Sequence, residues 1–356
     1  MWKPKDRDFI ETVEGLLFCV VGYLHPPDGY TAYLKYAPDP GGRWGKGETR
    51  YARAIPYYHV SQVEATYALL RERHPQYLLS CPVRGITVSS VPRARVRTYY
   101  HPRRRLSSLM AGGAGDALER RLVDLVALLS DLSGLGAGDF GVTGSLLTGI
   151  HNPGFSDIDL TVHGSGASQR LRRALAEAGA GSEIGRYSRG RMEDWSLSRS
   201  GRFPLSFEEL MGIAGRRWSY GLFEGTYFSV HPVRADGEIA EVYGDRVYRR
   251  RGAVTGTAEV ADNGEALFLP AVYRVADVEL EGYVSTYIHN VPVAYHVRED
   301  LVTDGTRCVV LFLDELNPSN SVLLALFSGR PGDDPAFDPV VGHKHRGVLR
   351  DGPRLR

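Results

Sequence analysis

The sequence predicts an α+β protein in which a central domain is flanked by two modules of different texture. Strand and helix patterns alternate up to about residue 105, a glycine-rich segment follows at Ala111–Gly115, and the pattern is nearly all β from about Arg251. We therefore divide the 356 residues into an N-terminal α+β module (1–110), a central domain with a mixed sheet and helices (111–250), a small C-terminal all-β barrel or sandwich (251–330) and a disordered tail rich in Pro, Gly and Arg (331–356).

In the N-terminal module we expect several strands and one helix. Ser61 with Glu64 is a capping-box pattern, and Pro75 ends the helix that it begins. The longest apolar run, which ends at Leu24, has only about ten residues and no basic segment before it, so it indicates a buried strand and neither a signal peptide nor a membrane span. The expected strands are 9–24, 30–36, 50–55, 85–91 and 93–99.

The central and C-terminal parts follow different patterns. Asp116 with Glu119 predicts a helix cap, and leucine or valine then recurs at helical spacing to about Leu132. Further helices are expected at 168–178 and from Ser206 through Trp218, a loose Arg/Ser-rich stretch at 185–201, and a strand at 226–233. The expected C-terminal strands are 253–260, 266–275, 278–287, 291–297, 308–313 and 321–327.

Composition excludes several classes of protein. With 43 Lys+Arg and 42 Asp+Glu the net charge is +1, which excludes a uniformly basic nucleic-acid coat and an acidic solvating protein. The three cysteines are far apart and have no C-x-x-C spacing, so they argue against a disulfide framework or zinc ribbon and favour a reducing cytoplasm. Lysine is scarce, which is most simply a coding bias; the alternative is a need for planar guanidinium groups at phosphates or bases. The lysines are Lys3, Lys5, Lys35, Lys46 and Lys344.

The segment from Gly144 to Val162 carries the strongest chemical signal. Asp157 and Asp159 alternate with aliphatic residues, so a strand here places both carboxylates on one face, about 6–7 Å apart. Two such carboxylates can share Mg²⁺ or Mn²⁺ with the phosphates of a nucleotide. Upstream, Gly144 permits close approach of a phosphate, and the hydroxyl of Ser145 can bind its oxygens. The alternative is a solvated Asp pair in a turn-rich α/β domain.

Gly144-Ser145, a loop of about ten residues, and Ser156-Asp157-Ile158-Asp159 together resemble the signature of the DNA polymerase beta-type nucleotidyltransferase superfamily. The resemblance covers roughly 116–175. It implies a nucleotidyltransferase-fold central domain in which Gly144 and Ser145 bind phosphates of an NTP and the two acids hold Mg²⁺ or Mn²⁺. It also implies transfer of an NMP to an acceptor hydroxyl, with release of pyrophosphate.

The third carboxylate of that family is missing from the expected strand at 226–233. Ser229 occupies the position of the acid, and the nearest candidates for a third metal ligand are Glu224 just before the strand and Glu241 after it. His231 is a further candidate ligand, although a structural histidine with satisfied hydrogen bonds is the simpler explanation. Without this acid the protein is a slow enzyme, takes a base from its substrate, or has lost catalysis, because the third acid usually serves as general base.

Two sets of arginines are candidates for binding nucleic acid or phosphate. As a strand, 93–99 would place Arg93, Arg95, Arg97 and Tyr99 on one face, which suits a nucleic-acid backbone with stacked bases. A polar outer sheet face explains the same pattern. Candidates for holding a triphosphate are Arg170, Arg172, Arg173, Arg216 and Arg217, and solvated helix faces explain them equally well.

We therefore expect a metal-dependent nucleotidyltransferase of the cytoplasm whose partners are an NTP and an RNA or DNA acceptor, with no membrane association. The first alternative is a non-catalytic RNA- or DNA-binding protein built on a nucleotidyltransferase relic. The second is an enzyme that transfers AMP to a protein or a small molecule.

Overall fold

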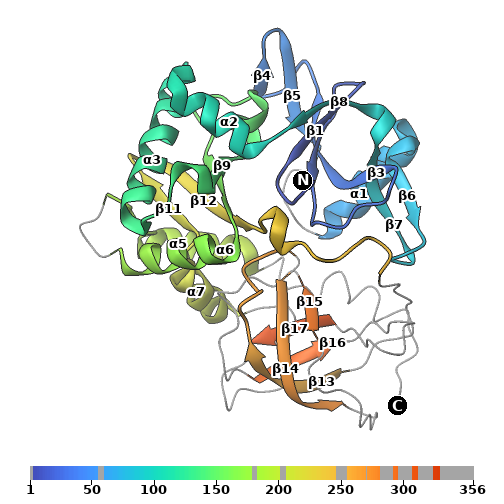
Figure 1. Cartoon of the computed structure of the whole chain (residues 1–356), viewed down its shortest axis with the longest axis vertical. Coiled ribbons are helices and arrows are strands. Elements are labelled where there is room, and N and C mark those ends of the chain that lie inside the picture. Colours follow the sequence, from blue (N-terminus) through green and yellow to red (C-terminus); the bar gives the residue numbers. More distant parts are fainter. Residues whose placement is uncertain are drawn as a thin grey trace.

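The computed structural model describes residues 3–54, 60–178, 183–200, 206–245, 255–269, 271–280, 292–295, 307–311 and 324–328. The fold is mixed α+β, with a curled antiparallel sheet at the N-terminal end, a mixed sheet with helices in the middle, and a further antiparallel sheet near the C-terminal end (Figure 1).

The first sheet curls around the strand β3 (Gly29–Pro38). This long strand pairs with β2, and its two ends pair with two further strands, β7 and β5. The sheet order is β4-β5-β3-β2-β1-β8, with β7 on β3 and β6 on β7. The other elements are β1 (Phe9–Thr12), β2 (Leu17–Val20), β4 (Trp44–Lys46), β5 (Thr49–Arg53), α1 (Val60–Arg73), β6 (Leu78–Cys81), β7 (Ile86–Pro92) and β8 (Val96–Tyr100).

Two predictions for this module are wrong. The single strand expected at 9–24 is a hairpin of β1 and β2, because Gly15 adopts a φ of +81° and its N–H bonds to Thr12 O at 2.9 Å, which closes a tight turn. The strand expected at 93–99 begins only at Val96, because Arg93–Arg95 form a 3₁₀ turn. The 3₁₀ turns are Pro75–Tyr77, Arg93–Arg95, Ala137–Asp139 and Asp236–Glu238, and a π turn spans Leu109–Gly113.

The central sheet has the order β11-β12-β10-β9, in which β10 and β12 run parallel and the outer pairs are antiparallel. Its strands are β9 (Phe140–Val142), β10 (Ile158–His163), β11 (Tyr220–Phe223) and β12 (Thr226–Val233). The helices are α2 (Pro102–Ser108), α3 (Ala117–Ser133), α4 (Gly144–Thr148), α5 (Ser165–Glu177), α6 (Arg189–Ser200) and α7 (Phe207–Arg216).

Two of the three predicted helix caps are confirmed, whereas α1 begins at Val60, one residue before the predicted cap Ser61. Asp116 accepts hydrogen bonds from the N–H groups of Leu118 and Glu119, both at 2.9 Å, and Ser206 forms a capping box with Glu209. The loose stretch expected at 185–201 is instead largely the helix α6. The Ser- and Arg-rich composition of this segment does not indicate a helix. The helix forms in contact with α7, and such packing rather than intrinsic propensity stabilises most helices.

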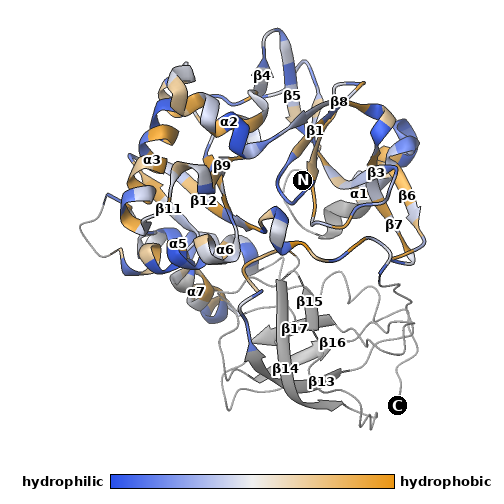
Figure 2. Cartoon of the chain, viewed as in Figure 1, coloured by the Kyte–Doolittle hydropathy of each residue, from blue (hydrophilic) through white to orange (hydrophobic). Residues whose placement is uncertain are grey.

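The apolar stripe of α3 packs on the central sheet. Hydrophobic residues are frequent in α3, in the central sheet and in the first sheet (Figure 2). Leu106 and Leu109, which precede the predicted domain boundary, belong to this core. A second cluster joins the first sheet to the central domain, because Leu147 and Ile150 pack against it. The members from the first sheet are Phe9, Leu17, Cys19, Tyr36 and Tyr51.

The third sheet is antiparallel, with the order β15-β14-β13-β16-β17. β14 covers the end of the strand expected at 266–275 and the start of the strand expected at 278–287. The rest of the second strand and the tail predicted at 331–356 lie outside the described residues. The strands are β13 (Thr255–Asp262), β14 (Ala271–Leu280), β15 (Pro292–Tyr295), β16 (Arg307–Leu311) and β17 (Leu324–Ser328).

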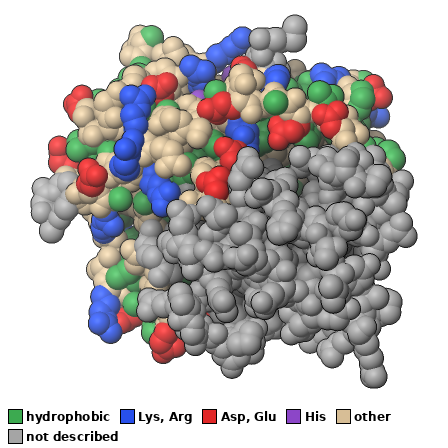
Figure 3. Space-filling model, turned by 60° about the horizontal axis from the view of Figure 1, so that its bottom comes forward, with side chains coloured by type: hydrophobic (Ala, Val, Ile, Leu, Met, Phe, Trp, Pro, Cys, Tyr) green, Lys and Arg blue, Asp and Glu red, His purple; other side chains and the backbone are tan. Residues whose placement is uncertain are grey.

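Charged side chains of both signs are interspersed over the described part of the face in Figure 3, as a net charge of +1 leads one to expect. Among the helices of the described residues, none has the length and apolarity needed to cross a membrane.

Candidate functional site

The acid pair lies at the start of the central strand β10. Asp157 directly precedes this strand and Asp159 is its second residue, while Ile158 and Leu160 between and after them are fully buried. Because successive side chains of a strand point to opposite faces, the two carboxylates share the face that is turned away from the α3 core. The structure thus has the alternation that the sequence indicates.

Gly144 packs directly against the second acid. It adopts a φ of +67°, and a Cβ at this position would lie 2.6 Å from Asp159 Oδ2, so only glycine fits here. The preceding residue, Thr143, donates its backbone N–H to Asp159 O at 2.8 Å. Ser145 follows in the first turn of α4 and is buried. The Gly-Ser turn and the acid pair, which the sequence separates by a loop, are therefore in contact.

Ser229 is the direct neighbour of Asp159 in the parallel pair of β10 and β12. Its hydroxyl donates to Asp159 Oδ1, and its oxygen lies 2.9 Å from His231 Nε2. Because the single hydroxyl proton points to Asp159, the imidazole is the donor in the second bond. His231 Nε2 is 3.7 Å from the same carboxylate oxygen. A serine and a histidine therefore line the position beside the acid pair.

Neither glutamate that we considered as a third ligand joins the pair. Glu224 lies in the turn between β11 and β12, at a φ of 45°, and forms an ion pair with Arg121 of α3 at 3.2 Å. Glu241 is an exposed residue after the last strand of the central sheet. In the part of the chain that the structure describes, no group of three or more His, Cys, Asp or Glu side chains could hold a metal ion.

The two carboxyl groups differ in pKa. Burial and the negative charge of Asp159 raise the pKa of Asp157 to about 6, against the opposing charges of Arg53 and Lys35. For Asp159, burial acts in the same direction, but its neighbours outweigh it, and its pKa is lowered. These neighbours are the imidazole of His231, the ammonium of Lys35 and the hydroxyl of Ser229. Near neutral pH the pair therefore carries a strong negative charge.

Lys35 and Arg53, whose charges act on the acid pair, come from β3 and β5 of the first sheet. Lys35 is only 8% exposed, and its Nζ lies 5.4 Å from the centre of the Phe9 ring. Neither residue could be predicted from the motif, because both lie over 100 positions before the acids. The only local signal was the scarcity of lysine.

Arg7 approaches the Gly-Ser turn from the segment before β1. Its carbonyl oxygen accepts a hydrogen bond from Thr143 Oγ1 at 2.6 Å, and its backbone has a φ of 69°, which is unusual for a residue other than glycine. Its Nε is buried and forms an ion pair with Asp6 Oδ2 at 3.2 Å. The segment before the first sheet is therefore fastened to the Gly-Ser turn through the backbone of Arg7.

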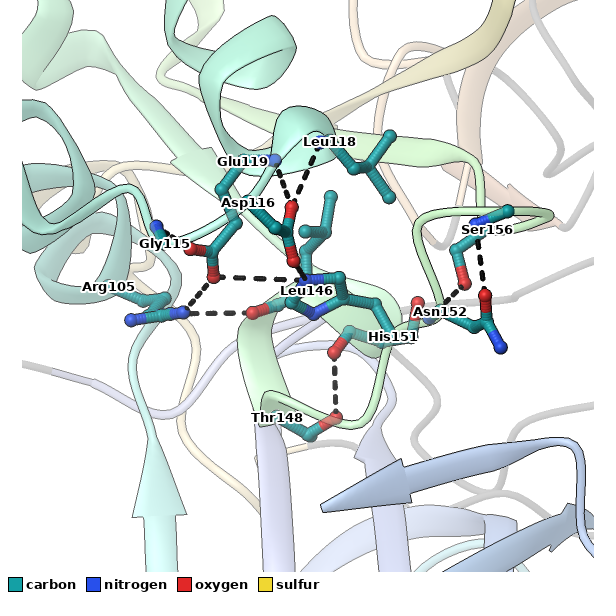
Figure 4. A network of polar contacts seen from close by, with 12 residues as sticks. Arg105, Gly115, Asp116, Leu118, Glu119, Leu146, Thr148, His151, Asn152 and Ser156 are labelled. Atoms are coloured by element: carbon teal, nitrogen blue, oxygen red, sulfur yellow. Dashed lines mark hydrogen bonds and ion pairs between the residues drawn. The ribbon is translucent and has the colours of Figure 1, made fainter. Parts of the chain in front are cut away.

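The loop between Gly-Ser and the acids is held by a network of polar contacts (Figure 4). His151 Nε2 lies 2.8 Å from Asp116 Oδ2, and Arg105 bonds to Glu119 and to the carbonyl of Leu146. Within the loop, the N–H of Asn152 donates to Ser156 Oγ at 3.0 Å, and the N–H of Ser156 donates back to Asn152 O at 2.9 Å. The start of α3 thus fixes the loop that presents the acids.

The predicted arginine face at 93–99 does not form as one strand face, because of the 3₁₀ turn at Arg93–Arg95. Arg95 and Arg97 form ion pairs with Glu14 and Glu11 at 3.0 and 3.2 Å. Arg93 donates to Pro27 O at 2.7 Å and lies over the ring of Tyr30, and Tyr99 donates its hydroxyl to Asp8 at 2.7 Å. Carboxylates of the β1–β2 hairpin thus neutralise two of the three arginines.

Of the arginines considered for the triphosphate, those of α5 lie away from the acid face, whereas Arg217 lies on it. The ring of Tyr220, on which Arg217 stacks, points to the same face as its cross-strand partner Ser229. Arg170, Arg172 and Arg173 are on α5, whose buried leucines pack with the α3 side of the sheet. Arg217 stacks on Tyr220 with 3.6 Å to the ring centre, and the side chain of Arg216 lies outside the described residues.

Comparison with known proteins adds a similarity over most of the chain. No family model matches it, and no solved structure matches it. The chain is similar to an uncharacterized protein of Methanocaldococcus jannaschii, with 29% identity over 280 residues, which cover 77% of this chain and 81% of that protein. This span is longer than the predicted central domain, so the similarity includes sequence outside it.

Proposed function

We propose that the protein is a metal-dependent nucleotidyltransferase that transfers an NMP from an NTP to an acceptor hydroxyl and releases pyrophosphate. The observation that carries this proposal is the contact between Gly144 and Asp159, which brings the Gly-Ser turn against the acid pair. A phosphate bound at this turn would lie next to the carboxylates, as transfer through a metal-bound triphosphate requires.

The residues present fit a hard divalent ion such as Mg²⁺ or Mn²⁺. Asp157 and Asp159 present carboxylate oxygens on one face, and the missing Cβ of Gly144 leaves space beside Asp159 Oδ2. Such ions prefer carboxylate oxygens completed by phosphate oxygens of a nucleotide. When bound, the ion stabilises charge that develops on the phosphoryl group during transfer.

Other residues would act on the nucleotide or the acids directly. Ser145 and the backbone at the start of α4 would contact the NTP phosphates. Lys35 offsets the charge of the acid pair. Ser229 stands where the superfamily places a carboxylate that activates the acceptor hydroxyl, so we expect a slow reaction or a base supplied by the acceptor.

The test is labelling with each α-³²P NTP, Mg²⁺ or Mn²⁺, and total RNA, oligo-DNA or the protein alone. We expect label in one acceptor that EDTA abolishes and that Asp157→Asn with Asp159→Asn abolishes. The matched control is Asp124→Asn with Asp131→Asn, which removes two exposed carboxylates of α3 and leaves labelling unchanged. Labelling that survives in the first double variant would refute the proposal.

Ser229 favours a second candidate function, a nucleic-acid-binding protein that has lost catalysis. Its position beside Asp159 leaves β12 without the third acid. EDTA-sensitive labelling of any acceptor contradicts this candidate. Label in protein rather than RNA or DNA would instead identify an enzyme that transfers AMP to protein hydroxyls.

We extend the proposal to the layout and location of the chain. A nucleotidyltransferase-fold domain lies between an N-terminal α+β module and a C-terminal β module, and the protein works in the cytoplasm. Support for the location comes from Cys19 and Cys81, which are buried free thiols.

A further inference from the structure

The hairpin of β4 and β5 projects from the first sheet in Figure 1. Its basic side chains lie over aromatic rings of the hairpin itself and of neighbouring segments. Arg53 lies over the ring of Trp44 at 5.0 Å, and Trp44 makes an edge contact with Phe155 at 5.5 Å. Arg43 covers the other ring, 4.3 Å from the centre of Phe155. Further along the hairpin, Lys46 lies 5.4 Å from the ring centre of Tyr100.

This surface is accessible and locally basic. Arg43, Lys46 and Arg53 are exposed, Trp44 is half-buried, and Phe155 is 39% exposed, one of few large apolar side chains that reach solvent in the described residues. The cations lie on rings, whereas Arg95 and Arg97 of the predicted arginine face lie on carboxylates. The charges of Arg43 and Lys46 are therefore exposed at the hairpin, whereas those of Arg95 and Arg97 are neutralised by carboxylates.

The same surface leads to the acid pair. Phe155 belongs to the loop between Gly-Ser and the acids and lies two residues before Asp157. The N–H of Gly45 donates to Ile150 O at 2.9 Å, which fastens the hairpin to that loop. The charge of Arg53 reaches Asp157. A chain lying along the rings would thus have one end at the carboxylates.

We propose that the hairpin surface, defined as Arg43, Trp44, Lys46, Arg53 and Phe155, binds a single-stranded nucleic acid and directs its end to Asp157 and Asp159. Every base has a π-face that can stack on an exposed ring, and guanidinium and ammonium groups neutralise the backbone between bases. A duplex would keep its bases stacked on each other and could not use the rings. This inference rests on the proposed function, for which it names the acceptor class.

Binding is measured by fluorescence anisotropy with the full chain and a fluorescein-labelled 12-mer of U or dT, in EDTA and without NTP. We expect salt-sensitive binding of both 12-mers. Phe155→Leu keeps an apolar side chain but removes the ring, so we expect affinity to fall about tenfold, whereas Phe155→Trp retains it. Arg43→Gln with Lys46→Gln should lower the slope of log K against log salt by about 1.4, as for two lost phosphate contacts on a single strand.

The matched control is Arg95→Gln with Arg97→Gln, which removes the same charge from the same module and should change affinity less than twofold. The inference is overturned if the wild type binds neither 12-mer, if Phe155→Leu binds as tightly as the wild type, or if the control loses as much as the hairpin variant. Because the assay contains no metal or NTP, binding without any labelling would refute only the proposed transfer. Labelling of protein without binding of a 12-mer would refute only the hairpin surface.

Discussion

The arginines at 93–97 are a group of positive charges, and Asp157 and Asp159 are a group of negative charges. The fold compensates the two groups in different ways. Glu11 and Glu14 neutralise Arg97 and Arg95 through ion pairs at the surface. The acid pair faces Lys35, which is 8% exposed and comes from another module. Exposed ion pairs contribute little to stability, whereas removing one partner of a buried charge is costly. The single buried Lys35 should therefore contribute more to stability than the clustered, exposed Arg95 and Arg97.

Replacing Lys35 tests the buried half of this comparison and should have the largest effect. Lys35→Met leaves the two acids without their buried cation, so we expect the free energy of unfolding to fall by about 3 kcal/mol in EDTA. Urea denaturation at pH 7.5 measures it. Asp157→Asn in the Lys35→Met background should recover part of the loss, because it removes one uncompensated charge. An additive double mutant would contradict the coupling.

Gly144→Ala tests whether the Gly-Ser turn needs its close contact with Asp159. The new Cβ meets the carboxylate at 2.6 Å, and the backbone φ of +67° disfavours alanine. We expect the free energy of unfolding to fall by about 2 kcal/mol and labelling activity to be lost. Gly166→Ala in α5 is the control, since nothing lies within 4 Å of its Cβ, and it should not destabilise the protein. Equal stabilities of the two variants would contradict the packing argument.

His25 of the first module is held in its neutral form, and the pH dependence of stability tests this. Its Nδ1 accepts the N–H of Thr31 at 3.2 Å, and burial, then the charges of Arg84 and Arg93, lower its pKa to about 4. In the unfolded chain it takes up a proton below about pH 6.5, so its contribution is present above that pH and is lost as the pH falls through 4. We expect a loss of about 1–2 kcal/mol between pH 6.5 and 4.5.

The measurement is the difference in urea midpoint between wild type and His25→Gln at pH 4.5, 5.5 and 7.5. This difference should be constant above pH 6.5 and shrink in acid. A difference that grows as the pH falls would show that the imidazole is charged in the folded protein.

The exposed half of the comparison predicts the smallest effect. Arg95→Gln with Arg97→Gln breaks two surface ion pairs, so stability should fall by less than about 1 kcal/mol and change little with salt. Thermal unfolding at low and high salt checks this. A loss as large as that of Lys35→Met would show that surface pairs dominate this module.

Local patterns predicted those parts of the fold whose contacts are local. The caps at Asp116 and Ser206 satisfy N–H groups two or three residues away, and the strand expected at 226–233 is observed with the same bounds. The hairpin at Gly15 and the helix α6 were missed, because one rests on a single turn within an apolar run and the other on contact with α7.

The candidate site divides in the same way. Its glycine, its serine and its two acids form a spaced motif, and the register of β10 with β12 then places Ser229 beside Asp159. No local pattern indicated the basic residues that the first sheet brings to this motif, or the contact of Trp44 on the β4–β5 hairpin with Phe155 of the loop.

By itself, the sequence determined the alternating acids, the glycine before them and the helix caps, because periodicity and capping act over a few residues. Only the tertiary structure decided which cation faces Asp159 and which arginines are neutralised. The arginine pairings join segments of the first module more than 80 positions apart in the chain, and the approach of Lys35 to Asp159 depends on how the curled sheet packs on α4. Charges read along the sequence show what a fold must compensate, and packing decides what compensates it.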